Sequence, residues 1–177
     1  GWAGVQAIPR ILTLDHKNRL VMTPVENLKA LYTTGHHFTA ADCDAEPLPV
    51  SGTALDIYAS FNIDSDEACG LILRSAANNA EYTEILYQPD TGALHILRHY
   101  DDANVETFAQ GVLHPLDDGE SLDLRILLDG SVLEVIANKR SSVTSRIYPS
   151  QSGEQNVSIQ NAAMVASLII HEVASIW

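Results

Sequence analysis

The chain has few basic residues and no long apolar run. It carries 10 Lys and Arg against 23 Asp and Glu, which gives a formal net charge of -13. Binding to nucleic-acid phosphates or to anionic lipids needs clustered Lys and Arg, so this shortage argues against nucleic-acid and membrane partners. The apolar runs are also far too short for a membrane-spanning helix. An acidic surface suits neutral substrates such as sugars, and solubility alone also explains it.

Cysteine is scarce as well. Cys43 and Cys69 are the only two cysteines, which is too few for a disulfide scaffold or a cysteine-based zinc site. They either form one bridge in a secreted protein or remain separate buried thiols. The triplet Asn156-Val157-Ser158 matches the N-glycosylation sequon. We therefore expect an extracellular or secretory location.

The usual signatures of a catalytic or metal site are also missing. The sequence contains no Gly-x-Ser-x-Gly and no Gly-rich phosphate loop. His95 and His99 share a face of an expected strand but stand roughly 13 Å apart, too far to bind one metal ion. The acidic clusters fall in expected turns, where Asp side chains usually accept hydrogen bonds from local backbone N–H groups. The sequence thus predicts no catalytic, cofactor-binding or metal-ligating residue in this chain.

Alternating apolar and polar residues are the strongest structural signal that is present. They alternate from Ser121 to Leu128 and from Thr53 to Ile63, a period of two that marks a half-buried strand. Asp129-Gly130 follows the first run as a tight turn, because Gly and Asp tolerate positive φ, and Ser131–Ala137 is the expected return strand. This hairpin predicts the burial of four side chains: Leu124, Ile126, Leu133 and Val135.

Further short strands are expected along the whole chain. They are Val5–Leu14, Gly70–Ser75, Tyr82–Gln88, Ala93–His99, Val105–Ala109, Ser142–Tyr148, Asn156–Gln160 and Met164–Val173. The one expected helix is short, Pro24–Leu31, and residues 42–52 are expected to form an irregular connection. Without helices of crossover length, short strands separated by turns indicate antiparallel pairing. The predicted fold is all-β, a two-sheet antiparallel β-sandwich of jelly-roll or lectin-like type over residues 31–177. Residues 1–30 are a linker and packing segment.

Several segments, in a fixed order, resemble one known family. They are Gly1–Asp15 with its Ile8-Pro9-Arg10, Pro24–Leu28, Gly70–Arg74, Leu128–Asn138, Thr144–Pro149 and the closing Ser175–Trp177. The family is glycoside hydrolase family 32, which contains invertases, inulinases, levanases and fructosyltransferases. There, the first segment closes a catalytic five-bladed β-propeller and leads into a C-terminal β-sandwich.

The resemblance implies that the chain is the C-terminal module of a β-fructofuranosidase or fructosyltransferase that acts on sucrose, inulin or levan without a cofactor. The family's catalytic motifs Asn-Asp-Pro, Arg-Asp-Pro and Glu-Cys are absent, so this chain alone is expected to be inactive. Its implied partner is the propeller of the same enzyme. The module would brace the propeller, shape the substrate cleft or mediate a homodimer.

Residues near the two ends of the chain are the expected contacts with that propeller. They are Trp2, Val5, Ala7, Arg10 and Trp177, and Arg10 is expected to pair with an acid outside the sandwich. The alternative function is a lectin-like carbohydrate-binding module that holds fructan in a groove of its own. In that case tyrosines could stack on sugar rings, although packing within the sheets also explains them. The tyrosines concerned are Tyr58, Tyr82, Tyr87 and Tyr100.

Overall fold

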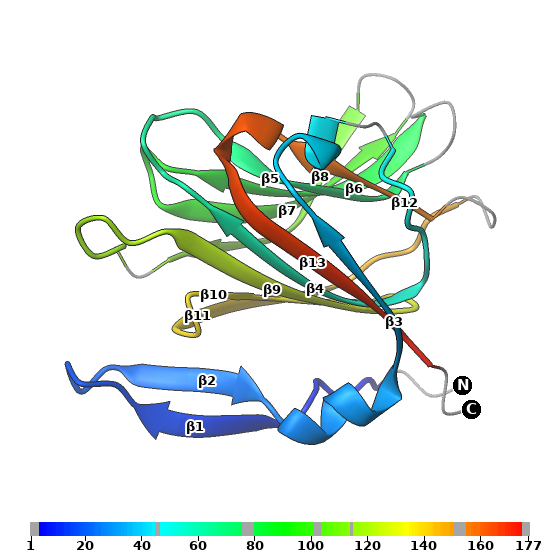
Figure 1. Cartoon of the computed structure of the whole chain (residues 1–177). Coiled ribbons are helices and arrows are strands. Elements are labelled where there is room, and N and C mark those ends of the chain that lie inside the picture. Colours follow the sequence, from blue (N-terminus) through cyan, green and yellow to red (C-terminus); the bar gives the residue numbers. More distant parts are fainter. Residues whose placement is uncertain are drawn as a thin grey trace.

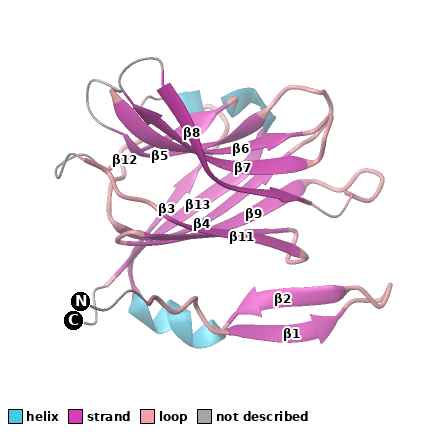
Figure 2. Ribbon diagram, turned by 180° about the vertical axis from the view of Figure 1, so that it is seen from behind, coloured by secondary structure: helices cyan, strands magenta, loops and turns pink. Residues whose placement is uncertain are grey.

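The computed structural model describes residues 4–44, 47–75, 80–100, 104–113, 115–150 and 155–174 (Figure 1). Two antiparallel sheets pack face to face, and a separate two-stranded hairpin lies against the outer face of the larger sheet (Figures 1 and 2). The predicted all-β, two-sheet antiparallel sandwich is confirmed. The division into residues 1–30 and 31–177 stays a prediction.

The larger sheet has six strands, whose order mixes distant parts of the chain. In spatial order they are β11 (Ser141–Arg146), β10 (Val132–Ala137), β9 (Leu122–Asp129), β4 (Ala54–Phe61), β13 (Val165–Val173) and β3 (Tyr32–Phe38). The last strand of the chain therefore lies between two early strands. This interleaving fixes the outer face of the sheet, on which the candidate site is built.

The smaller sheet has five strands, and most of its neighbours follow one another in sequence. Its order is β12 (Asn156–Gln160), β5 (Cys69–Ser75), β6 (Glu81–Gln88), β7 (Ala93–Tyr100) and β8 (Asn104–Val112). The separate hairpin consists of β1 (Arg10–Leu14) and β2 (Leu20–Pro24). Short 3-10 turns complete the described elements: η1 (Glu26–Leu31), η2 (Asp42–Asp44) and η3 (Ala162–Met164).

The core lies between the two sheets, where alternate residues of each strand meet. The four side chains predicted to be buried in the β9–β10 hairpin are all buried. They meet buried residues of the five-stranded sheet such as Leu71, Ile85 and Ile96. Within the five-stranded sheet, Gly70 on β5 lies against the backbone of β6, because a Cβ atom built there would lie 1.8 Å from the Ile85 carbonyl oxygen.

The β9–β10 turn differs from the prediction by one residue. Asp129 pairs with Val132, so the connection is Gly130-Ser131 rather than Asp129-Gly130. Gly130 has φ +57 and stands at the first central position, where a two-residue hairpin can require a positive φ. Both cysteines are free and buried, which decides between the two alternatives for them. Burial raises the pKa of the Cys69 thiol to about 12.

Some of the predicted elements were wrong or missing. Strand β3 (Tyr32–Phe38) was not predicted, because its residues do not alternate and the edge strand depends on pairing with β13. The first strand starts at Arg10 rather than Val5. The short helix is a 3-10 turn from Glu26 to Leu31. No helix in the described part of the chain is long and apolar enough to cross a membrane.

Truncating a core leucine tests the register of the β9–β10 hairpin. Leu124→Ala should destabilise the fold by about 2–4 kcal/mol, because it removes buried methyl groups and leaves a cavity. Leu12→Ala is the matched control, since Leu12 is exposed on β1. Thermal or urea unfolding of both variants measures the difference. Equal melting temperatures for Leu124→Ala and wild type would show that Leu124 does not face the core.

Candidate functional site at the hairpin and six-stranded sheet

The outer face of the six-stranded sheet carries carboxylates that are buried. Glu134 of β10 pairs across with Leu127 of β9, Leu127 with Asp56 of β4, and Asp56 with His171 of β13, so these residues share one face. Asp56 is 0% and Glu134 1% exposed. A buried carboxylate is stable only when it is paired and hydrogen-bonded. The partners of these carboxylates therefore identify what covers this face.

Glu134 is held by the segment that enters the hairpin. The Ile8 backbone N–H donates to its Oε1 at 2.7 Å, and Arg10 Nη2 donates to its Oε2 at 2.6 Å. Arg10 Nη1 also donates to Ser142 Oγ at 2.8 Å on β11. We call these contacts the Glu134 anchor. The acid that pairs with Arg10 belongs to the sandwich of this chain, so the expected pairing with an outside acid was wrong.

Asp56 ties the residues that follow the hairpin to the same face. Arg125 Nε and Nη2 donate to its two oxygens at 3.1 and 2.8 Å, and the Tyr32 hydroxyl donates to Oδ2 at 2.6 Å. The Arg125 guanidinium also lies 4.7 Å from the centre of the Tyr58 ring. Burial and the hydrogen bond to Asp56 raise the pKa of Tyr32 well above its usual value. Tyr32 is therefore a neutral hydrogen-bond donor.

His171 completes this cluster. Its ring stacks on Tyr32 at a centroid distance of 4.1 Å and meets the Tyr58 ring edge-on at 6.1 Å. Gly35 on β3 leaves room for it, because a Cβ atom there would lie 3.1 Å from the His171 Nδ1 atom. Burial lowers the pKa of His171, Asp56 partly offsets this effect, and the nearby His37 and Arg125 lower the pKa further. The fold therefore favours the neutral ring.

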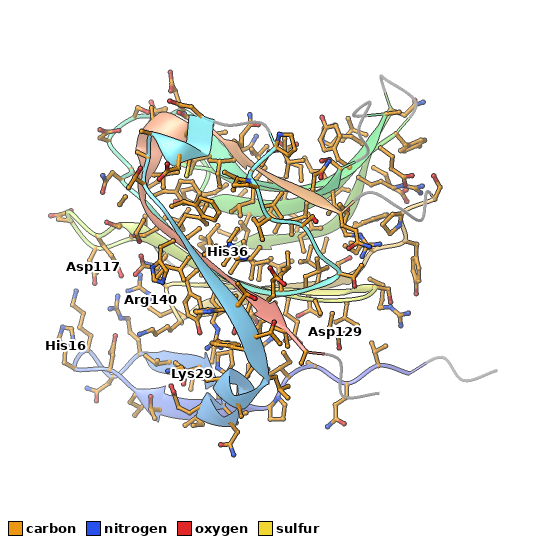
Figure 3. The ribbon with its side chains drawn as sticks, turned by 45° about the vertical axis from the view of Figure 1, so that its right-hand side comes forward. His16, Lys29, His36, Asp117, Asp129 and Arg140 are labelled. Atoms are coloured by element: carbon orange, nitrogen blue, oxygen red, sulfur yellow. The ribbon has the colours of Figure 1, made fainter. Side chains whose placement is uncertain are left out.

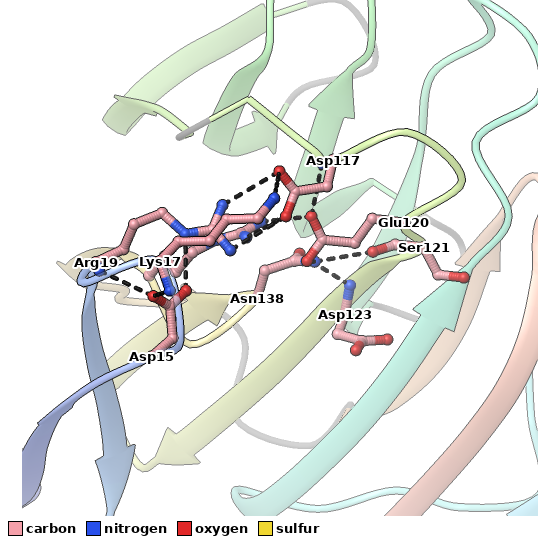
Figure 4. A network of polar contacts seen from close by, with 9 residues as sticks. Asp15, Lys17, Arg19, Asp117, Glu120, Ser121, Asp123 and Asn138 are labelled. Atoms are coloured by element: carbon pink, nitrogen blue, oxygen red, sulfur yellow. Dashed lines mark hydrogen bonds and ion pairs between the residues drawn. The ribbon is translucent and has the colours of Figure 1, made fainter.

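A third set of contacts holds the tip of the hairpin (Figure 4). Lys17 Nζ lies 2.8 Å and Arg19 Nη2 3.1 Å from the Asp117 carboxylate, in the loop that precedes β9. Arg140, after β10, bonds to Glu120 at 2.7 Å. The side chains of Lys17, Arg19 and Asp117 are partly exposed, so water screens their ion pairs, whereas Arg140 is buried and belongs to the sandwich. Asp117 and Glu120, which the sequence places in a turn, thus also form ion pairs with residues of other elements.

A pocket of about 310 Å³ lies between the hairpin and the sheet. Met22 and Pro24 of β2 form one side, and Tyr58, Asp123 and Arg125 belong to the opposite side. A backbone hydrogen bond of 2.7 Å from the Met22 N–H to the Lys139 carbonyl fixes the edge of β2 beside it. Of the tyrosines considered from sequence, Tyr58 is the one that lines this space.

The other residues predicted to contact the propeller do not belong to these clusters. Val5 and Ala7 are exposed, while Trp2 and Trp177 lie outside the described residues. The sequence prediction missed three leucines of the hairpin that are 50% exposed or more: Leu12, Leu14 and Leu20. They share one face of the β1–β2 ribbon, as the pairs Leu12–Met22 and Leu14–Leu20 show. The alternation Arg10, Leu12, Leu14 could have revealed them.

His95 and His99, the two histidines considered as metal ligands, have separate partners, and so does His36. His36 contacts Glu172 at 2.8 Å, His95 contacts Gln88 at 3.1 Å and His99 contacts Glu84 at 2.6 Å. Among the described residues, no group of three or more His, Cys, Asp or Glu side chains is arranged to hold a metal ion. The two most deeply buried carboxylates, Asp56 and Glu134, are both paired with arginine.

Comparison with known proteins gives consistent matches. The family model described as "Glycosyl hydrolases family 32 C terminal" matches residues 27–175. Beta-fructofuranosidase 1 of Zea mays is 30% identical over 194 residues, covering 86% of this chain and 29% of the relative. Sucrose:sucrose 1-fructosyltransferase of Festuca arundinacea is 28% identical over 222 residues, covering 99% of this chain and 34% of the relative. The chain thus spans about a third of the length of these relatives.

The fold also matches solved structures. Fructan 1-exohydrolase IIa from Cichorium intybus superimposes with a TM-score of 0.75 at 16% identity, covering 99% of this chain and 42% of that one. At this identity the likeness concerns the fold alone. Its coverage includes the β1–β2 hairpin as well as the sandwich.

Removing Arg10 tests the Glu134 anchor. Arg10→Met leaves Glu134 buried with only the Ile8 N–H as a partner, so it should cost about 2–5 kcal/mol of unfolding free energy. Faster hydrogen exchange in residues 10–24 should accompany this loss. Adding Glu134→Leu should recover most of the stability, because the unpaired charge is then gone. Lys17→Met, which breaks a partly exposed pair, is the control and should cost less than about 1 kcal/mol. Equal costs for Arg10→Met and Lys17→Met would contradict the anchor.

His171 should make the fold sensitive to mild acid. Its pKa in the fold lies below the ordinary value of 6.5, so unfolding takes up a proton as the pH falls. The stability that the neutral ring provides is complete above about pH 6.5 and decreases as the pH falls towards the folded pKa. His171→Phe keeps a ring against Tyr32 but cannot titrate. Its stability, measured by urea unfolding, should fall less than that of wild type between about pH 7 and pH 5. Identical slopes would exclude His171 as the source.

Proposed function

Because the chain belongs to the C-terminal domain family of the glycosyl hydrolases of family 32, we propose that it is the β-sandwich module of a β-fructofuranosidase-type enzyme. The enzyme would act on sucrose or on fructans through a catalytic β-propeller outside these residues. The module's role would be structural: to brace the propeller and form one side of the substrate cleft. The names of the relatives, a beta-fructofuranosidase and a fructosyltransferase, support the substrate class.

The observation that carries this proposal is a hairpin that is anchored to the sandwich at one end and keeps exposed leucines further along it. Arg10 and Ile8 hold one end of it to the sandwich through buried Glu134. Leu12 and Leu14 remain 62% and 65% exposed. In the described part of the chain β1 pairs only with β2, so its other edge is open. Open strand edges and contiguous apolar patches mark surfaces that another element covers.

The buried acids of this chain are unsuited to glycoside hydrolysis. The reaction needs two carboxyl groups across the scissile bond, one of them able to donate a proton. Asp56 and Glu134 instead each form an ion pair with an arginine, Arg125 and Arg10 respectively. Both oxygens of each carboxylate accept hydrogen bonds from groups of this chain, which leaves neither acid available to a scissile bond. Catalysis would therefore come from the propeller, and this chain would supply position and stability.

An extracellular or secretory location is part of the proposal. Its support is the sequon at Asn156, which stands at the start of β12 and is partly exposed. The free, buried state of both cysteines neither requires nor opposes an oxidising compartment.

Reconstitution tests the proposed function. The chain alone should release no reducing sugar from sucrose or inulin. Supplied with the catalytic domain of the same enzyme as a second polypeptide, it should form a complex, and its melting temperature should rise by mass action. Leu12→Glu should weaken the complex, because it places a charge in the apolar contact. Val112→Glu is the matched control, since Val112 is equally exposed but lies on β8 of the other sheet.

Some outcomes would contradict the proposal. Hydrolysis by the chain alone, above a heat-killed control, would mean that a catalytic site lies within it. Equal weakening by Leu12→Glu and Val112→Glu would show that the leucine face is not the contact. A stable monomer with no gain in melting temperature on adding the catalytic domain would favour an independent carbohydrate-binding module.

A further inference from the structure

The pocket between β2 and the six-stranded sheet has the construction of a small-molecule site. Its volume of about 310 Å³ lies at the lower end of the range for ligand pockets, about 300–1,000 Å³. The base of the pocket is formed by side chains of adjacent strands that point to the same face of the six-stranded sheet. Ser167 pairs with Ser60 and Ser60 with Asp123, so their side chains follow one another on three adjacent strands. Neighbouring strands are about 4.8 Å apart, which spaces these oxygen atoms along the pocket.

Asp123 is a fixed acceptor with capacity left for a ligand. Ser60 Oγ donates to its Oδ1 at 2.7 Å, and within the described part of the chain its Oδ2 accepts no hydrogen bond. Two hydrogen bonds with Asn138 fix the backbone of Asp123: the Asp123 N–H donates to Asn138 Oδ1 at 3.1 Å, and the Asn138 N–H donates to the Asp123 carbonyl oxygen at 2.8 Å. An acceptor held in this way loses little entropy when a ligand binds.

Unused donors face the same space. Arg125 uses Nε and Nη2 for Asp56, and its Nη1 makes no hydrogen bond to another described residue. Lys139 is exposed at the rim and forms no ion pair with any described residue. The pocket thus offers an acceptor and a donor two residues apart on β9, and a second donor in the turn between β10 and β11. This combination suits a ligand that carries several hydroxyl groups, each able to donate and to accept.

The charges around the pocket favour a neutral ligand. Asp56 neutralises Arg125, and Asp123 balances Lys139 across the opening. An anion would meet the Asp123 carboxylate, and a cation would meet Lys139. Met22, Pro24 and Ile136 add apolar surface, against which the C–H groups of a sugar ring can pack.

We propose that this pocket binds a neutral mono- or disaccharide. The proposal goes beyond the structural role argued above, and only the choice of sucrose as a probe rests on that role. The site belongs wholly to this chain, since every residue named for it lies in the hairpin or the sandwich. Binding would connect β2 to β4, β9 and β13, and so would strengthen the attachment of the hairpin.

Titration of the chain with sucrose and with fructose tests the proposal. Calorimetry and amide NMR should show saturable binding with Kd of about 1–10 mM, and the amides of Ser60, Asp123 and Ser167 should shift. Asp123→Asn should weaken binding about tenfold, because a charged acceptor is lost. Asp129→Asn is the matched control, since Asp129 is an exposed acid at the opposite end of β9, away from Asp117 and Arg140 (Figure 3). The affinity of Asp129→Asn for the sugar should equal that of wild type, and both variants should keep the wild-type melting temperature.

The outcomes are distinguishable from those of the reconstitution experiment, because no catalytic domain is present. The absence of saturable shifts at these amides up to about 100 mM sugar would overturn the site. So would equal affinities for Asp123→Asn and Asp129→Asn. Displacement of the sugar by inorganic phosphate would overturn the neutral-ligand assignment in favour of an anion site. Failure of reconstitution, with sugar binding intact, would leave this inference standing and remove only the structural role.

Discussion

A buried carboxylate on the outer face of a sheet constrains everything that lies above it. Glu134 stands on a strand whose inward neighbours, Leu133 and Val135, fill the core. The side chain of Glu134 points to the other face, where a buried carboxylate is stable only if it is paired and hydrogen-bonded. The pairing comes from Arg10 and the Ile8 backbone, more than 120 residues earlier in the chain. The position of the whole β1–β2 hairpin follows from satisfying this one group.

The same constraint fixes one end of the hairpin and leaves other residues of it exposed. The residues that touch the sandwich are polar or bonded through the backbone, as at Arg10 and Met22. Leu12, Leu14 and Leu20 share the ribbon face of Arg10 and Met22 but stay exposed further along it. A ribbon that is fixed through polar contacts and still carries exposed apolar side chains is suited to join two bodies. The space enclosed between its fixed points is the pocket, and its polar groups come from the sheet.

The β9–β10 hairpin could be predicted from sequence because its signal is local. A period of two and a Gly in a tight turn are enough to place Leu124 and Val135 in the core. Strand β3 could not be predicted in this way. It is an edge strand, and its Tyr32 and Gly35 have their positions because of His171 on β13. A local sequence pattern contains no information about a pairing strand as distant in the chain as β13 is from β3.

The sequence by itself determined the class of the fold, the burial of the alternating strands and the family resemblance, since these depend on residue type and spacing. Only the tertiary structure decided which acid receives Arg10, which tyrosine lines a pocket and that the cysteines stay apart. Charge pairing is set by distances between strands that the chain order does not fix. The interleaved order of the six-stranded sheet brings Asp56, Arg125 and His171 together. The buried carboxylate of Asp56 holds this arrangement, because leaving a buried charge without its partner costs more free energy than local secondary-structure propensity can offset.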